Sequence, residues 1–270
     1  MTLVDAPEPQ GPRLWLKGLR VQTRVLYALA IRELMTRYGR DNIGFLWLIL
    51  EPMILCAGVV FLRWMIQEHH EHGVSLVAML LSGYMPLTLW RHMTGKAIFL
   101  FRRNGSMLFH RRISLVDAYL ATVALEFVGC TIAFIVNYGA LVAIGVLDPI
   151  EDYGMVAAGW FTMAILGAGA GAAIAVLTEK YEASERFIQP MQYLILPLCG
   201  FLFMMDWLPD NVQKLAWWMP LIHSFEMIRA GFFGNTVTTH FTPQYPILFV
   251  LVLLAISVPK FESTRDDLHV

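Results

Sequence analysis

Long apolar segments constrain this chain more than any other feature. A helix needs about 20 mainly apolar residues to cross the hydrocarbon core of a bilayer. Only 15% of the residues are charged, against about 25% in an ordinary soluble domain. The sequence therefore predicts an all-α integral membrane protein with six transmembrane helices, near residues 44–66, 76–100, 116–147, 154–178, 187–205 and 244–259.

The distribution of Lys and Arg predicts how these spans are oriented. Of the 20 basic residues, 15 lie in segments that six spans would place on one side: 1–43, 101–115, 179–186 and 260–270. The loops on the other side, near 67–75 and 148–153, contain none. The positive-inside rule therefore predicts that both termini are cytoplasmic. A net charge of −1 argues against a nucleic-acid partner.

The cytoplasmic N-terminus, 1–43, is expected to contain an amphipathic helix. Within 19–40 the apolar positions Val21, Val25, Leu29, Leu34 and Tyr38 alternate with basic ones. Such a helix lies along the membrane surface and presents its basic side chains to anionic lipid or to a partner protein. The alternative is a helix that only anchors the chain. Residues 44–259 then form the transmembrane domain, and 260–270 form a cytoplasmic tail.

The segment between the fifth and sixth spans, 206–243, is neither a polar loop nor a full span. Pro209 and Pro220 divide it into two short, aromatic-rich pieces. Tryptophan and amphipathic helices favour the membrane interface, so we expect a helical hairpin in the outer leaflet. The alternative is a pair of lipid-facing surface helices without a functional role.

A polar strip is predicted on the second piece of this hairpin. His223, Glu226 and Arg229 recur every third residue, which places them within one arc of a helix. We expect Glu226 to pair with Arg229 and to accept a hydrogen bond from His223, and the strip to fix the hairpin at the outer mouth of a passage.

Three short motifs resemble functional patterns, but a simpler role explains each of them. LGAGAGAA at 166–173 fits a dinucleotide fingerprint but lies inside an apolar span, so Gly167 and Gly171 are expected to permit close helix packing. HHEH at 69–72 contains zinc-binding residue types, but adjacent residues rarely converge on one ion, and a solvated, pH-sensitive loop is favoured. The cysteines, Cys56, Cys130 and Cys199, are expected to be small buried hydrophobes.

Several ionisable or amide side chains fall within or at the ends of the spans and should face protein or a wet cavity. Glu51 and Glu126 lie deepest. Paired carboxylates can perform acid–base chemistry, but no nucleophile or metal set is apparent near them, so a structural or gating ion pair is favoured and no metal is expected. The ionisable and amide side chains within or at the ends of the predicted spans are Glu51, Arg63, Arg91, His92, Lys96, Asp117, Glu126 and Asn137.

Four stretches in order resemble the membrane subunit of capsular-polysaccharide exporters of the ABC-2 type. They are RELMTRYGRDNIGFLWLILEP at 32–52, SGYMPLTLWRHMTG at 82–95, FRRNGSMLFHRRISLVDAYLA at 101–121 and MPLIHSFEMIRAGFFG at 219–234. The resemblance implies a homodimer in the bacterial inner membrane with two separate ATP-hydrolysing subunits. It also implies export of a lipid-linked anionic polysaccharide, handed on to periplasmic and outer-membrane export proteins.

The chain itself has no G-x-x-x-x-G-K-[ST] motif, so ATP and Mg²⁺ are expected only in the partner and no cofactor in this chain. Residues expected to couple to the ATPase are Arg32, Glu33, Arg37, Arg102, Arg103, Asn104, Arg111 and Arg112. Aromatic residues expected to line the passage are Trp47, Phe61, Trp64, Tyr193, Phe201 and Phe203, which could equally face lipid or the core. Gating or structural polar roles are expected for Glu51, Arg91, His223, Glu226 and Arg229.

Other functions compete with this interpretation. Within transport, the alternatives are an ABC-2 permease for O-antigen, teichoic acid or a small molecule. From other classes, they are a membrane-embedded glycan-lipid transferase and a structural scaffold. A neighbouring gene for a P-loop ATPase would favour transport over either.

Overall fold

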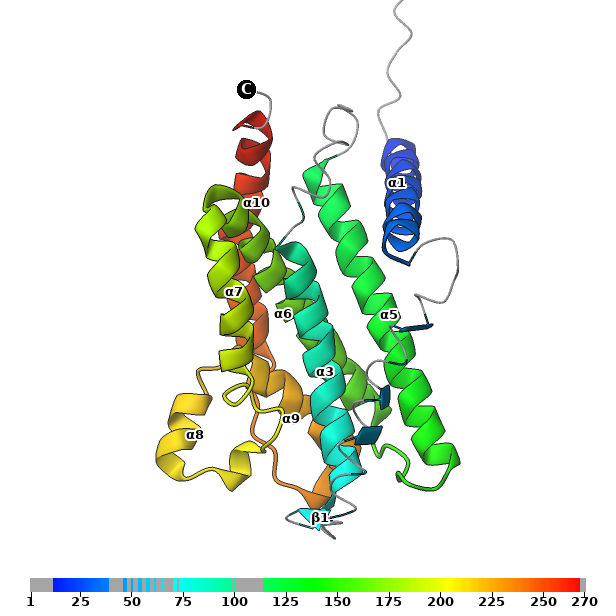
Figure 1. Ribbon diagram of the computed structural model, residues 1–270, viewed down its shortest axis with the longest axis vertical. Helices are drawn as coiled ribbons and strands as arrows, with labels where there is room; N and C mark the ends of the chain where they lie inside the picture. The colour runs from blue at the N-terminus through cyan, green and yellow to red at the C-terminus, as the bar shows by residue number, and fades with distance from the viewer. Residues whose placement is uncertain are drawn as a thin grey trace, which may run out of the picture.

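Apolar sequence in this chain forms a bundle of long helices. The structure is a computed structural model that describes residues 12–38, 70–71, 73–98, 100 and 114–267, with scattered positions between 46 and 65. The bundle helices are α3 (Leu76–Ala97), α5 (Leu115–Ala143), α6 (Tyr153–Lys180), α7 (Glu182–Ile195) and α10 (Gln244–Asp267). They run roughly along a common axis (Figure 1).

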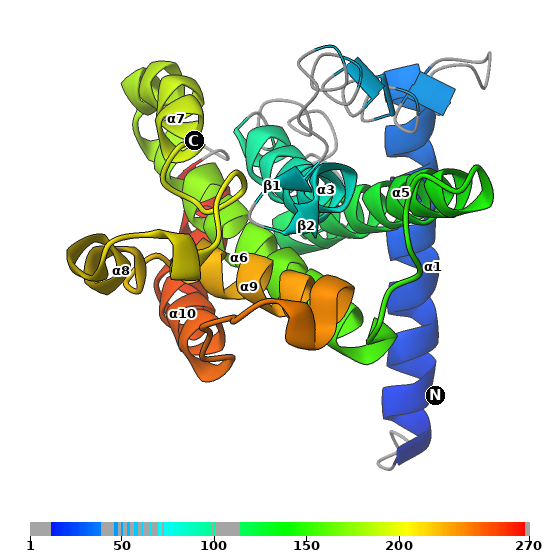
Figure 2. The same ribbon diagram turned by 90° about the horizontal axis from the view of Figure 1, so that it is seen from below.

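The remaining elements lie at the two ends of this bundle. Helix α1 (Pro12–Tyr38) lies at the end where α10 finishes, and it runs across the bundle axis, as the two views together show (Figures 1 and 2). The other end holds α8 (Asp210–Ala216), α9 (Pro220–Phe233) and an antiparallel pair of two-residue strands, β1 (His70–Glu71) and β2 (Val74–Ser75). Single 3₁₀ turns span Met205–Trp207 and Gly234–Thr236.

Helix α6 is the centre of the packing, because small residues along it admit its neighbours. It packs against α3, α9 and α10. A Cβ atom added at Gly167 would lie 2.8 Å from the Met93 sulfur of α3, and one at Gly171 would lie 2.7 Å from the Tyr119 hydroxyl of α5. These glycines therefore permit close helix packing, and the prediction made for them is confirmed.

Local sequence signals fix the starts of α5 and α6. At α5 the Ser114 hydroxyl accepts from the Val116 N–H, and the Asp117 side chain accepts from the Ser114 N–H, which makes a capping box. At α6 the Asp152 carboxylate accepts from the Met155 N–H at 3.0 Å. The predicted span 154–178 is confirmed as a helix, and the predicted span 116–147 is helical to Ala143, after which the chain turns.

The length and apolar content of the described helices can be compared with the six predicted spans. Among the described residues, three helices are long and apolar enough to cross a membrane: Leu115–Ala143, Tyr153–Lys180 and Gln244–Phe261. Helix α3 has 22 residues, about 33 Å of helix, but it carries Arg91, His92 and Lys96. The first predicted span, 44–66, lies largely outside the described residues, although the described positions within it are helical.

The predicted end of the fifth span is wrong. The fifth span, expected over 187–205, is helical only to Ile195 and continues as turns. Pro197 cannot supply an N–H to prolong the helix, and Gly200 has a φ of 90°, a backbone conformation that ends a helical path. The predicted last span, 244–259, agrees with Gln244–Phe261, which is long and apolar enough to cross a membrane, and the helix itself continues past Pro259 to Asp267.

Candidate functional site

Helix α9 carries the predicted polar strip, and the structure buries it. His223 and Arg229 are 0% exposed and Glu226 is 1% exposed. Their helix packs closely on α6, because a Cβ atom at Gly159 would lie 2.9 Å from the Ile228 nitrogen and one at Gly231 would lie 2.6 Å from the Asp152 carbonyl oxygen. This helix is therefore part of the core, and it is not a lipid-facing surface helix.

Arg229 binds the turn that follows α7. Its Nη1 atom donates to the Gly200 carbonyl at 2.7 Å and also to the Phe203 carbonyl, and its Nη2 atom donates to the Phe201 carbonyl at 2.7 Å. A planar guanidinium with several fixed donors suits such a cluster of acceptors. Gly83 of α3 makes room for this turn, since a Cβ atom there would lie 2.2 Å from the Phe201 oxygen.

Glu226 binds two further segments through their backbone. Its Oε1 atom accepts from the Met205 N–H at 3.1 Å, and its Oε2 atom accepts from the His240 N–H at 2.9 Å. Met205 lies in the connection before α8, and His240 lies in the connection before α10. One buried carboxylate thereby joins two connections to α9 through charge-assisted hydrogen bonds.

His223 completes the strip by binding the connection between α8 and α9 and, as Glu226 does, the connection before α10. Its Nδ1 atom accepts from the Thr242 N–H at 3.1 Å, which leaves the proton on Nε2 to donate to the Trp217 carbonyl at 3.0 Å. The imidazole also meets the rings of Trp217 and Tyr245 edge-on, at centroid distances of 4.9 and 5.2 Å. These contacts define a neutral tautomer.

This network differs from the predicted one. We expected His223 to donate to Glu226 and Glu226 to pair with Arg229, whereas the hydrogen bonds described for the three side chains run to backbone groups. Side chains three apart on a helix are neighbours, but the irregular connections around α9 leave buried N–H and carbonyl groups that also need partners. The strip therefore holds together the connections on either side of α9.

A second polar region lies between α3 and α7. The Arg91 guanidinium lies 5.0 Å from the centroid of the Tyr193 ring, a cation–π contact. One helical turn away, the Gln192 amide donates to the Thr94 hydroxyl at 3.1 Å. The sequence assigned Arg91 and Tyr193 to different roles, and the structure brings them into contact.

The predicted passage residues differ in exposure. Tyr193, Trp47 and Phe61 are 60%, 57% and 58% exposed, whereas Phe201 and Phe203 are half-buried in the turn held by Arg229. Trp64 lies outside the described residues, as does Glu51. That these aromatic side chains line one passage stays a prediction.

The structure also gathers residues that sequence reasoning left apart. His92 of α3 lies beside Glu126 and Cys130 of α5, with 3.2 Å between His92 Nδ1 and Glu126 Oε2. Sequence analysis found no metal set near Glu126 and did not connect it with His92. The i, i+4 spacing of Glu126 and Cys130 was a signal for half of this cluster, because it places them on one helix face.

Helix α1 contacts the start of α5. The Gln22 side chain donates to the Asp117 carboxylate, and Leu29 is buried. Val21 and Gln22 are exposed, and Val25 and Leu34 are half-buried. Ser114 and Asp117 immediately follow the loop 101–113, which lies outside the described residues.

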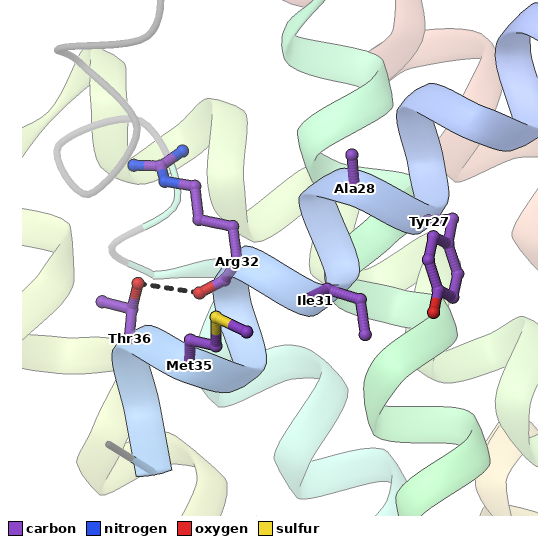
Figure 3. Close-up of a pocket in the computed structure, with 6 residues that line it drawn as sticks. All are labelled: Tyr27, Ala28, Ile31, Arg32, Met35 and Thr36. Carbon is purple, nitrogen blue, oxygen red and sulfur yellow. Dashed lines mark hydrogen bonds between the residues drawn. The ribbon is translucent and has the colours of Figure 1, made fainter. Parts of the chain in front are cut away.

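The second half of α1 also has an open, exposed face. Its residues surround a shallow hollow of about 530 Å³, where the Thr36 hydroxyl donates to the Arg32 carbonyl at 2.8 Å (Figure 3). The hollow is lined by Tyr27, Ala28, Ile31, Arg32, Met35 and Thr36. Of the predicted coupling residues, Arg32 is exposed and Glu33 is half-buried. The side chains of Arg37, Arg102, Arg103, Asn104, Arg111 and Arg112 lie outside the described residues.

Comparison with known families matches residues 24–233 to the ABC-2 type transporter model. This match covers most of the chain. The chain belongs to the ABC-2 type transporter family. The matched region begins within α1 and ends with α9, so the family model includes both the crossing helix and the buried polar strip.

Family members with a named role in export are similar to nearly the whole chain. Capsule polysaccharide export inner-membrane protein CtrC of Neisseria meningitidis serogroup A is 36% identical over 90% of this chain and 92% of its own length. Capsule polysaccharide export inner-membrane protein BexB of Haemophilus influenzae is 34% identical over 88% and 90%. Polysialic acid transport protein KpsM of Escherichia coli is 22% identical over 93% and 96%.

Proposed function

We propose that this chain is the transmembrane subunit of an ATP-driven ABC exporter that moves lipid-linked capsular polysaccharide across the bacterial inner membrane. The observation that carries the proposal is 36% identity to a capsule polysaccharide export protein, sustained over 90% of the chain. A hydrophilic polymer cannot cross hydrocarbon without a lined passage. The bundle of long apolar helices provides a scaffold for such a passage.

The exporter is proposed to be a homodimer with six spans per subunit and both termini in the cytoplasm. Two ABC ATPase subunits would bind ATP and Mg²⁺, because this sequence carries no P-loop motif. Periplasmic and outer-membrane export proteins would receive the polymer. The position of α1 and the end of α10 at one end of the bundle supports placing both termini on one side (Figure 1).

The ATPase is proposed to bind where α1 meets the start of α5. Gln22 bonds to Asp117, which follows the basic segment 101–113 by four residues in the sequence. Arg32 is exposed on the open face of α1. A helix that contacts both the bundle and the partner can transmit motion between them.

The passage is proposed to use aromatic side chains near the turn after α7. Tyr193 is exposed beneath Arg91, and the strip on α9 holds the Phe201 and Phe203 backbone in place. Aromatic faces bind sugar rings weakly and without a fixed register, which suits a moving polymer. The strip would keep the outer mouth in shape.

Deletion of the gene in its bacterium tests this function. We expect surface capsule to disappear while polysaccharide accumulates inside the cell, and complementation with the intact gene to restore export. Unchanged capsule in the deletion strain would contradict the proposal. Loss of O-antigen or teichoic acid from the surface, with capsule intact, would favour the alternative permease.

A further inference from the structure

A cluster of three potential ligands connects α3 to α5 in the interior of the bundle. The His92 Nδ1 atom lies 3.2 Å from Glu126 Oε2 and 3.8 Å from Cys130 Sγ. All three ligand atoms lie within 4.8 Å of one another. Glu126 and Cys130 occupy successive turns of α5, so one helix face presents both to the histidine.

We propose that His92, Glu126 and Cys130 form a binding site for a divalent transition-metal ion, Zn²⁺ foremost. Imidazole, carboxylate and thiolate are the ligand types that zinc takes in proteins. Zinc binds N and O at about 2.0–2.1 Å and S at about 2.3 Å. Around a tetrahedral ion, these bond lengths place an N ligand about 3.3 Å from an O ligand and about 3.6 Å from an S ligand. The observed 3.2 and 3.8 Å agree with these two edges.

Charge and burial favour an ion at this point. The Glu126 side chain is 1% exposed within a helix long and apolar enough to cross a membrane, so an ion bound there would be shielded from solvent. Zn²⁺ with one carboxylate, one thiolate and a neutral imidazole has no net charge, which suits a medium of low dielectric constant.

The three ligands leave one position of a tetrahedron open. His92 is 21% exposed at its side chain, whereas Glu126 and Cys130 are buried, so an ion would enter from the His92 side. The fourth position would be taken by water or by another donor. A bound ion would fix α3 to α5 at the level of Glu126.

Co²⁺ absorption spectroscopy tests the site, because a tetrahedral Co²⁺–thiolate site has a ligand-to-metal charge-transfer band. The full chain is purified in detergent, freed of any histidine tag, in a background with Cys56→Ser and Cys199→Ser. We expect the band to appear on Co²⁺ addition and to be displaced by Zn²⁺. The HHEH segment at 69–72 has no thiol and cannot produce it.

Ligand substitutions give the matched comparison. Cys130→Ser should abolish the charge-transfer band. His92→Gln, at the more exposed position, should weaken Co²⁺ binding at least about 100-fold. Loss of an outer-shell partner costs up to about that much, and loss of a ligand should cost no less. The chain with only Cys199→Ser should bind as the native chain does. Gel filtration confirms that each variant remains folded.

X-ray absorption of the Zn²⁺-loaded chain gives a second readout that needs no ligand substitution. We expect one sulfur at about 2.3 Å and nitrogen or oxygen ligands at about 2.0 Å. The absence of a thiolate band, a metal shell without sulfur, or unchanged affinity in His92→Gln would each overturn the site and leave a histidine–carboxylate hydrogen bond only. None of these measurements depends on polysaccharide export.

Discussion

Glu226 illustrates how one side chain can hold several connections together. Both carboxylate oxygens accept from backbone N–H groups, those of Met205 and His240. Glu226→Gln keeps the shape but replaces one acceptor with an NH₂ group, which cannot accept from an N–H. Hydrogen bonds to charged groups contribute about 1.5–3 kcal/mol each. We expect the midpoint of thermal unfolding in detergent to fall by several degrees and export to decrease, while membrane insertion persists.

Asp210→Asn is the matched control for that variant, because Asp210 is an exposed carboxylate on α8. It should leave both the thermal midpoint and export close to native values. Native stability and native export in Glu226→Gln would refute the role assigned to this carboxylate.

Gly83 determines how closely the turn after α7 approaches α3. A Cβ atom at this position would lie 2.2 Å from the Phe201 carbonyl oxygen and 3.3 Å from an Arg229 nitrogen. We expect Gly83→Ala to displace the turn and to lower thermal stability, since a backbone atom is the obstacle. At Gly139 of α5 an added Cβ meets nothing within 4 Å, so Gly139→Ala should be neutral or slightly stabilising. Equal thermal midpoints for the two variants would count against this packing.

At the scale of elements, helix α1 is proposed to transmit motion between the bundle and the ATPase. Arg32 lies on its open face beside the shallow hollow. Reversing its charge with Arg32→Glu should reduce co-purification of the ATPase and lower export, because a basic partner-facing group becomes acidic. Arg20→Glu changes an exposed arginine three turns earlier on the same helix and should leave both readouts near native. Equal effects of the two substitutions would indicate a general dependence on basic charge and not a docking site.

Hydrophobic periodicity and the length of the apolar segments predicted which segments are helical. They predicted less well where the helices end and what they contact. Segments 116–147 and 154–178 were recognisable because long, mainly apolar segments have few alternatives to a helix in lipid. The turn after Ile195 depends on Pro197 and on the Arg229 hydrogen bonds from a distant helix, and the second of these cannot be read locally. The spacing of His223, Glu226 and Arg229 predicted a shared face but not its partners, which come from connections brought together only by the fold.

At the scale of the whole molecule, we expect the two ends of the bundle to lie on opposite sides of the membrane. Asp148 is exposed in the connection between α5 and α6, and Arg186 is exposed near the start of α7. In a background without native cysteines, Asp148→Cys should react with an impermeant maleimide in spheroplasts, and Arg186→Cys should react only after permeabilisation. Labelling of both from the same side would overturn the proposed topology.

ATP-dependent transport by the assembled complex tests the central claim most directly. Inverted inner-membrane vesicles containing this chain and its ATPase are supplied with lipid-linked capsular polysaccharide, and the polymer protected inside the vesicles is measured. The account predicts accumulation that requires ATP and both proteins. It also predicts loss of accumulation when a catalytically inactive ATPase replaces the active one. Equal accumulation without ATP or without this chain would contradict it.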